Sequence, residues 1–382
     1  KLKTMKKLLL ILLCVPLIGL GQVYIPDANF KAYLVGNTAI NTNGDSEIQV
    51  SEAAAFSGLI ECYNMSINDL TGIEDFTALW GLVCSNNQLT TLDVSNNTAL
   101  TWLICGENQL TNLNVSQNTL LTDLECQSNQ LISLDITQNT ALSYLDCNDN
   151  QLTTLDVSNN TDIYFLLCGG NQLTSLDLVN NTVLIHLQCQ SNQLTILDLS
   201  NNPALTDLQC QDNQITSLDV SNNTDLTSLE CNNNQLSNLI FNNDIEYVDC
   251  SGNLLTCIDV NSTTNLTNLN CSNNMLEQLS IKNNNWLILD VNAVSNNLTC
   301  VEVDNLGFAT NNWDIDGFAS FSLNCNYVNP CSNTSTAIQE HTTNKELLKI
   351  TDILGREVNE KRNTPLFYIY NDGTVEKKII FE

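Results

Sequence analysis

The chain has 382 residues and a formal net charge of -29, and only 6% of its residues are aromatic. Between residues 8 and 344 the only Lys or Arg residues are Lys31 and Lys282. An acidic body of this kind repels nucleic acid and anionic membrane surfaces, so we expect neither among its partners. With so few aromatic residues, the core must be thin and aliphatic.

The first segment, residues 1–21, has the pattern of a secretory signal peptide. Residues 5–7 (Met-Lys-Lys) form a short positive region, residues 8–18 an apolar run, and Gly19-Leu20-Gly21 a small-x-small cleavage site. Because the run is too short to span a bilayer, we expect export without membrane insertion. The alternative is a lipid anchor at Cys14, although its neighbours fit a lipidation box poorly.

Residues 22–53 predict an N-terminal cap in which two short helical patterns flank a polar loop. The loop, NTNGDSEIQVSE (41–52), resembles a single EF-hand: Asn41, Asn43 and Asp45 take positions 1, 3 and 5, the Glu47 carbonyl position 7, and Glu52 position 12. It departs from the motif at two positions: an Asn replaces the usual Asp at position 1, and a Ser replaces the usual Gly at position 6. The resemblance implies weak calcium binding, at roughly 10⁻⁴ M. The alternative is a polar loop that binds nothing.

From residue 54 to residue 331 the chain repeats itself. Eight cysteines recur every 21 residues from Cys84 to Cys231, and Cys250 and Cys271 follow after a shortened unit. A period of this size is typical of a solenoid, whose units bury their apolar faces only by stacking. In the unit 121–141, Leu121, Leu124 and Cys126 fill an LxxLxC strand, Asn129 turns the chain, and a second LxxLDV-like half follows.

This LxxLxLxxNxL pattern resembles that of leucine-rich repeats. The resemblance implies a mainly β fold: a parallel solenoid with short strands on both sides and few helices. It also implies that one column of asparagines points inward and bonds the backbone of adjacent turns (Asn87, Asn108, Asn129, Asn150, Asn171, Asn192, Asn213, Asn234, Asn253 and Asn274). A second column is expected to do the same on the other side (Asn97, Asn118, Asn139, Asn160, Asn181, Asn202 and Asn223).

The repeated cysteines are expected to be free thiols that fill the core. In-register strands lie roughly 4.8 Å apart with parallel Cβ vectors, whereas a disulfide needs Cβ atoms about 3.8 Å apart and zinc needs converging ligands. Cys300, Cys325 and Cys331 break the period, so we expect a disulfide among these three. From about residue 298 an aromatic-rich segment with Phe308, Trp313, Phe318 and Phe321 predicts a C-terminal cap.

The composition changes again after the repeats. Residues 332–346 form a polar linker, and residues 347–382 a compact strand-rich segment. The latter resembles the C-terminal sorting domain of type IX secretion substrates of Bacteroidetes-like bacteria, in LGRE (354–357), YIY (368–370), Gly373 and Lys377-Lys378. The resemblance implies passage through the type IX secretion machinery and removal of this segment at the cell surface. A small β appendage of the body is the alternative.

The outward positions of the LxxLxC strands carry the candidate binding residues. Side chains alternate along a strand, so the third and fifth positions face away from the core. Several of them are apolar or aromatic, which favours a binding surface over chance β-propensity. The predicted ligand-binding residues are Trp102, Ile104, Tyr144, Phe165, Leu167, His186 and Tyr247.

A second outward column is acidic, with the Asp of the LDV motif at Asp93, Asp135, Asp156, Asp177, Asp198 and Asp219. We interpret it as a solvated ladder that accepts hydrogen bonds from nearby turn amides. Weak cation bridging is the alternative.

Catalysis has little support, because the sequence has two histidines and no nucleophile, phosphate-loop or zinc motif. We therefore predict a non-enzymatic protein, secreted or at the cell surface, that binds a protein or polysaccharide through its strand face. The rival hypothesis is a structural matrix component that calcium and self-association organise.

Overall fold

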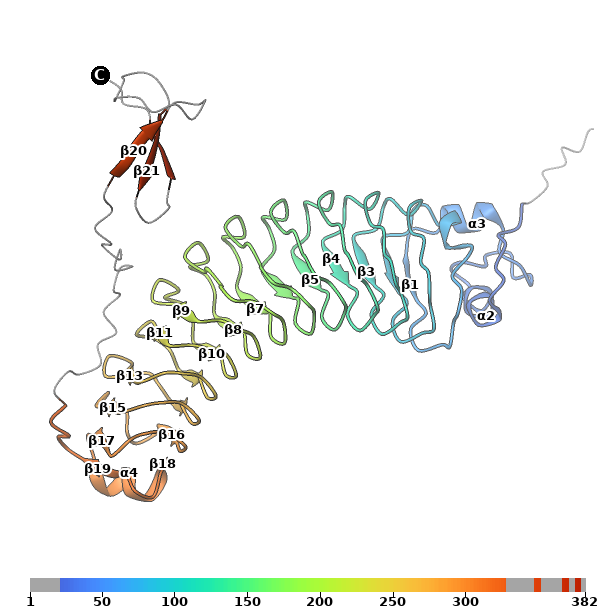
Figure 1. The fold of residues 1–382 in the computed structure, drawn as a ribbon. Coiled ribbons are helices and arrows are strands. Elements are labelled where there is room, and N and C mark those ends of the chain that lie inside the picture. The colour runs from blue at the N-terminus through green and yellow to red at the C-terminus, as the bar shows by residue number, and fades with distance from the viewer. Residues whose placement is uncertain (1–20, 328–346, 352–365, 371–374, 379–382) are drawn as a thin grey trace, which may run out of the picture. The chain divides into compact units, whose positions relative to one another are not determined.

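Figure 1 shows the computed structural model of the chain. The structure describes residues 21–327, 347–351, 366–370 and 375–378. The chain divides into two compact units, Lys1–Asn333 and Thr334–Glu382. Nearly all of the expected signal segment falls outside the described residues. Within the described ranges, no helix combines the length and apolar character that a membrane crossing requires.

The N-terminal cap contains the two expected helices, α2 (Ala28–Gly36) and α3 (Val50–Ala55). Asp27 caps α2, since its carboxylate accepts hydrogen bonds from the backbone N–H groups of Asn29 and Phe30. Phe30 and Leu34 are fully buried and join the solenoid core. The cap therefore covers the first apolar edge of the solenoid, as terminal units of repeat proteins must.

The solenoid is built on one parallel sheet of 13 strands. Neighbouring strands pair without a shift, so that Leu103 lies beside Leu124 and Leu124 beside Leu145. Each sequence column is therefore a line of side chains on the molecule, which confirms the expected parallel solenoid. The strands, in spatial order, are β1 (Leu59–Glu61), β2 (Gly81–Val83), β3 (Trp102–Ile104), β4 (Asp123–Glu125), β5 (Tyr144–Asp146), β6 (Phe165–Leu167), β7 (His186–Gln188), β8 (Asp207–Gln209), β10 (Ser228–Glu230), β12 (Tyr247–Asp249), β14 (Asn268–Asn270), β16 (Asp290–Ala293) and β18 (Asp314–Ile315).

On the second side of the solenoid, strands form only in the C-terminal half. There, β9 (Ser217–Asp219) pairs with β11 (Asn238–Ile240), and a four-stranded sheet contains β13 (Cys257–Asp259), β15 (Gln278–Ile281), β17 (Cys300–Val303) and β19 (Ser320–Ser322). Earlier repeats have a 3-10 turn, η1 (Ile73–Asp75), and one isolated bridge between Asp93 and Asn114. Their second halves keep recurring backbone bonds, such as Gln130 N to Leu110 O, without forming strands, so the expected strands on both sides are found from β9 onward.

The 13-stranded sheet lies on the inner side of the solenoid's bend, and β9, β11, β13 and β15 lie on the outer side (Figure 1). We call the outward surface of the 13-stranded sheet the concave face.

The core consists of stacked Leu and Cys layers held by the asparagine ladder. Asn129 is typical: its Nδ2 donates to the carbonyls of Cys105 and Cys126 at 3.1 Å, and its Oδ1 accepts from Leu110 N at 2.9 Å. The ladder cysteines from Cys84 to Cys271 are buried free thiols, which confirms their predicted role in the core. Burial raises the pKa of Cys105 to about 12, so this thiol stays protonated and inert.

The second asparagine column also bonds adjacent turns, through one atom only. Asn118 Nδ2 donates to the carbonyls of Val94 and Asn97 at 2.9 Å. The Oδ1 atom of Asn118 is buried without a hydrogen-bond partner among the described residues.

The C-terminal cap is a chain of edge-to-face aromatic contacts around α4 (Leu306–Asn312). Ring centroids lie 5.4 Å apart for Trp286 and Phe308, 6.3 Å for Phe308 and Trp313, and 6.2 Å for Trp313 and Phe321. Trp313 is buried, and its Nε1 donates to the Leu289 carbonyl at 2.8 Å. Phe318 is 69% exposed and takes no part in this cover, contrary to expectation.

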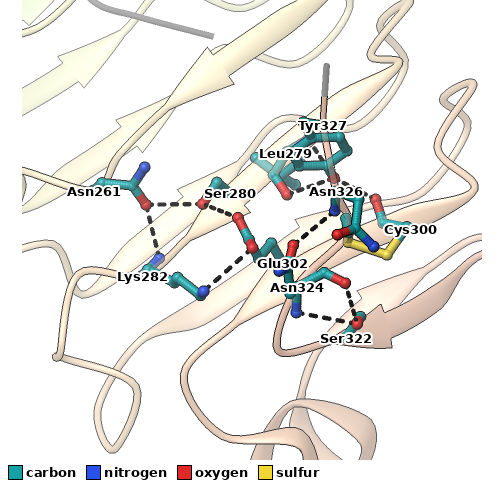
Figure 2. A network of polar contacts seen from close by, with 11 residues as sticks. Asn261, Leu279, Ser280, Lys282, Cys300, Glu302, Ser322, Asn324, Asn326 and Tyr327 are labelled. Atoms are coloured by element: carbon teal, nitrogen blue, oxygen red, sulfur yellow. Dashed lines mark hydrogen bonds and ion pairs between the residues drawn. A yellow bond between two sulfur atoms is a disulfide. The ribbon is translucent and has the colours of Figure 1, made fainter. Parts of the chain in front are cut away.

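A disulfide and a polar network fasten the end of the solenoid (Figure 2). Cys300 bonds to Cys325, which confirms a disulfide among the three cysteines outside the period; Cys331 lies outside the described residues. Cys257 is also disulfide-bonded, which the sequence analysis did not anticipate. The Tyr327 hydroxyl donates to the Cys300 carbonyl at 2.6 Å and accepts from Leu279 N at 3.2 Å.

The second unit contains an antiparallel sheet of β20 (Leu347–Thr351), β21 (Leu366–Tyr370) and β22 (Val375–Lys378), in that order. The linker, residues 332–346, lies outside the described residues.

Candidate ligand-binding face

The short strands of the main sheet present two columns of side chains to the outside. In each strand the middle residue is buried, as Leu103, Leu124 and Leu145 show, because side chains alternate along the strand. The residues on either side of it face outward. We call the column that runs through Trp102 and Tyr144 the aromatic column, and the one that runs through Ile104 and Asp146 the flanking column.

The aromatic column brings most of the predicted ligand-binding residues together. Tyr144, Phe165 and His186 pair in register on β5, β6 and β7. Their rings stack, with centroids 5.8 Å apart for Tyr144 and Phe165 and 5.3 Å apart for Phe165 and His186. All three side chains are half-buried, and because their faces stack on one another, it is mainly the ring edges that remain open to solvent.

Two of the predicted aromatic residues stand apart from that row. Trp102 is separated from Tyr144 by Asp123, which lies between them in register. Tyr247 lies three strands beyond His186, after Asp207 and Ser228. It lines a separate shallow hollow with Asp249, Asn270 and Asp290.

Sequence reasoning missed two aromatic residues beside the column. Trp80 stacks on Trp102 with ring planes 5° apart and centroids 6.3 Å apart. Tyr164 makes an edge-to-face contact with Phe165, with centroids 5.2 Å apart. Both precede a strand by one residue, and only the third and fifth positions of the LxxLxC motif were considered. The available signal was an aromatic residue at a position where most other repeats carry Thr or Ser.

The flanking column contains apolar, acidic and amide side chains. Ile104 and Leu167 are half-buried, and Glu125 and Asp146 lie on the two strands between them. Burial raises the pKa of Glu125, and the carboxylates of Asp146 and Asp123 raise it further. Burial likewise raises the pKa of Asp146, although a hydrogen bond from Asn148 N opposes the shift.

His186 links the aromatic column to a carboxylate. Its Nδ1 lies 3.2 Å from Asp207 Oδ1 on the next strand, and both side chains are mostly buried. The imidazole therefore lies beside Asp207, and its ring stacks on Phe165.

The loop at residues 41–52 is held together by hydrogen bonds among the residues of the predicted calcium site. Asn43 Nδ2 donates to Asp45 Oδ2 at 2.9 Å, and Asn43 N donates to Glu52 Oε1 at 3.0 Å. Asn41 reaches the same turn, because its Nδ2 donates to the Asp45 carbonyl at 2.8 Å. Glu47 turns its carboxylate to Lys31 at 2.7 Å, which leaves only its carbonyl for position 7.

The loop contains few charges that a cation could use. In the described ranges no three His, Cys, Asp or Glu side chains group so as to hold a metal ion. The loop would rely on the carboxylates of Asp45 and Glu52 together with amide and carbonyl oxygens, which is typical of weak calcium sites.

Comparison with known proteins places this geometry in context. No protein-family model matches the sequence. Internalin J of Listeria monocytogenes is 41% identical over 74 residues, which are 19% of this chain and only 8% of that protein. The solved functional domain of InlJ, described as including a cysteine ladder, matches at a TM-score of 0.66 and 28% identity, over 94% of this chain and 97% of that one. The chain has the leucine-rich-repeat fold.

Two more distant structures share the leucine-rich-repeat fold. The ectodomain of the Arabidopsis thaliana receptor kinase GASSHO1/SCHENGEN3, solved in complex with CASPARIAN STRIP INTEGRITY FACTOR 2, has a TM-score of 0.60 at 22% identity, over 72% of this chain and 37% of that one. The Yersinia pestis effector YopM has a TM-score of 0.56 at 22% identity, and the match covers 74% of this chain and 77% of that one. Within the fold, this chain is close to the Listeria internalins.

Proposed function

We propose that this leucine-rich-repeat chain is a non-enzymatic binding protein, secreted or at the cell surface, that holds a protein or polysaccharide on its concave face. One observation carries the proposal: the rings of Tyr144, Phe165 and His186 stack in register on an exposed strand surface. The same positions hold Ser228 and Asn268 in other repeats, so the fold does not require rings there. Rigid, half-exposed aromatics are favoured binding anchors.

The comparisons support binding rather than chemistry. The InlJ domain aligns over almost the whole of both chains. The plant ectodomain was solved with a partner, so this fold can hold one. For export we rely on the resemblance of residues 1–21 to a signal peptide and of residues 347–382 to a type IX sorting domain. A reporter that carries residues 1–21 at its N-terminus and residues 347–382 at its C-terminus should reach the surface of a bacterium that has a type IX system, and retention inside the cell would contradict this assignment.

The test of the concave face is attachment of the full chain to an array of extracellular-matrix proteins and polysaccharides. The variant Trp102→Ser, Tyr144→Ser, Phe165→Ser should lose roughly tenfold or more in affinity for whichever surface the wild type binds. The matched control replaces exposed apolar residues outside the concave face, by Ile132→Ser, Val179→Ser and Ile196→Ser, and should bind like wild type. Equal loss in both variants would contradict the proposal.

The rival function is a matrix component organised by calcium and self-association. The gathering of Asn43, Asp45 and Glu52 in the 41–52 loop favours a role for calcium. Attachment that survives the concave-face variant, together with calcium-dependent self-assembly in light scattering, would favour this rival over ligand binding.

A further inference from the structure

The carboxylates of the concave face have no basic residue to balance them. Residues 32–281 contain no Lys or Arg, and the flanking Lys31 and Lys282 are paired with Glu47 and Glu302 at 2.7 and 3.2 Å. Among the described residues, the only cationic group facing these carboxylates is the imidazole of His186, when protonated. The carboxylates concerned are Asp123, Glu125, Asp146, Asp207, Glu230 and Asp249.

The fold does not need these charges. On other strands the flanking column holds neutral amides, as at Gln188, Gln209 and Asn270. Like charges directly opposite one another on adjacent strands are unfavourable, and Glu125 lies opposite Asp146 in register. The negative charge of this column therefore lowers the stability of the sheet.

Asp146 and the aspartates of the LDV motif accept the same kind of turn bond, but they differ in burial. Asp135 and Asp156 accept hydrogen bonds from Thr137 and Ser158, and those bonds lower their pKa. Asp146 has its pKa raised by burial and is only 9% exposed. Its one hydrogen bond within the described part of the chain comes from Asn148 N to Oδ1, so Oδ2 is left without a partner.

Aromatic rings and carboxylates that lie close together favour a ligand with Lys or Arg side chains. The face of an aromatic ring attracts Lys and Arg side chains, and a desolvated carboxylate binds the same groups by charge-assisted hydrogen bonds. Asp123 lies between Trp102 and Tyr144 in register, and Asp146 lies on the same strand as Tyr144. A Lys or Arg side chain that lies over this part of the face meets a ring and a carboxylate at once.

We propose that the concave face binds a cationic, extended segment of a partner protein, with Arg or Lys side chains held between the aromatic column and the carboxylates of the flanking column. This inference rests on the proposed function, because it names the chemistry of the partner for the same face. The strands from β3 to β12 are separated by seven spacings of about 4.8 Å, or roughly 34 Å. An extended chain rises about 3.3 Å per residue, so a segment of about ten residues spans them.

The probes are three ten-residue peptides that carry Arg, citrulline or Glu at alternate positions with Ser between them. Citrulline keeps the shape of Arg and removes its charge. Affinity is measured by fluorescence polarisation with the full chain at low and high salt. We expect the Arg peptide to bind at least about tenfold more tightly than the citrulline peptide, and the difference to shrink at high salt.

Two charge-matched variants separate a built site from the general acidity of the chain. Glu125→Gln with Asp146→Asn removes two charges from the concave face and should weaken Arg-peptide binding about tenfold or more. Asp135→Asn with Asp156→Asn removes two charges from the opposite side of neighbouring repeats and should change binding less than twofold. Asn114 already occupies the LDV position and accepts the same turn bond, from Ser116 N, so the control variant should fold.

The outcomes distinguish this inference from the proposed function. Failure of the Arg peptide to bind, equal binding of the Arg and citrulline peptides, or equal losses in the two variants would overturn the cationic partner. If the array nevertheless shows attachment that depends on Trp102, Tyr144 and Phe165, the proposed function stands with a neutral partner or a polysaccharide. If that attachment is also absent, both fall.

Discussion

The asparagine ladder offers the sharpest test of how the solenoid is held together, and Asn150→Ala is the perturbation of choice. Asn150 is buried. Its Oδ1 accepts from Leu131 N at 3.0 Å, and its Nδ2 donates to the carbonyls of Cys126 and Cys147 at 3.1 and 3.2 Å. The substitution leaves Leu131 N without its acceptor. The two carbonyls each keep one other ladder bond, from Asn129 and Asn171 respectively.

The expected loss follows from these bonds. An orphaned buried N–H costs about 1–3 kcal/mol, and each weakened carbonyl adds about 0.5–1 kcal/mol, so the free energy of unfolding should fall by roughly 2–5 kcal/mol. Since each coil contacts only its neighbours, the damage should remain local. Native-state hydrogen exchange should therefore show faster exchange of the Leu131 amide than of amides several repeats away.

The matched control is Asn159→Ala in the same repeat. Asn159 is exposed and makes a single bond of 3.3 Å to the Thr137 carbonyl, so the loss should stay within about 0.5 kcal/mol. Urea unfolding monitored by tryptophan fluorescence measures both variants. Equal losses for Asn150→Ala and Asn159→Ala, or an unchanged Leu131 exchange rate, would refute the ladder as the fastening of adjacent turns.

Three further predictions concern charge, metal and thiols. The pKa of Glu125 is higher in the folded chain than its ordinary value of 4.5. Its negative charge therefore destabilises the fold fully when the pH is above the folded-state pKa, and has no effect on stability when the pH is below the unfolded-state pKa. Glu125→Gln should therefore raise the melting temperature by the order of 1–2 °C at pH 7 and leave it unchanged at pH 3, and a gain at both pH values would contradict this. Calcium at 5 mM should stabilise the wild type by about 2 kcal/mol. Glu52→Gln should abolish that melting shift and Glu47→Gln, whose carboxylate faces Lys31, should keep it; an equal shift in both would remove the site. The Cys105 thiol, with a pKa of about 12, should resist iodoacetamide at pH 8 until the chain unfolds, and rapid native-state labelling would show that the core opens.

Most of the fold could be predicted because every repeat has the same pattern of buried residues. Leu, Cys and Asn recur at fixed positions, and only in-register stacking buries all three columns at once, as the pairing of Leu124 with Leu145 shows. The strands of the second side were harder to predict. The LDV half alternates in the same way whether or not its backbone pairs, so its pattern does not distinguish β9 from the unpaired segments of earlier repeats.

The candidate face could be predicted only in part. Alternation along the strand placed Tyr144, Phe165 and His186 outward, but it says nothing about which rings touch. Trp80 lies outside the strand, so its stacking on Trp102 depends on the three-dimensional path of the chain. The disulfide bonding of Cys257 likewise depends on that path and not on repeat spacing.

Hydroxyl-radical footprinting of the full chain, with and without a surface or peptide that it binds, tests the role of the concave face most directly. Trp102, Tyr144 and Phe165 should be protected on binding, whereas Tyr24 and Phe318, which are 75% and 69% exposed, should be labelled as before. Protection of Tyr24 or Phe318 with unchanged labelling of the aromatic column would place the binding surface elsewhere.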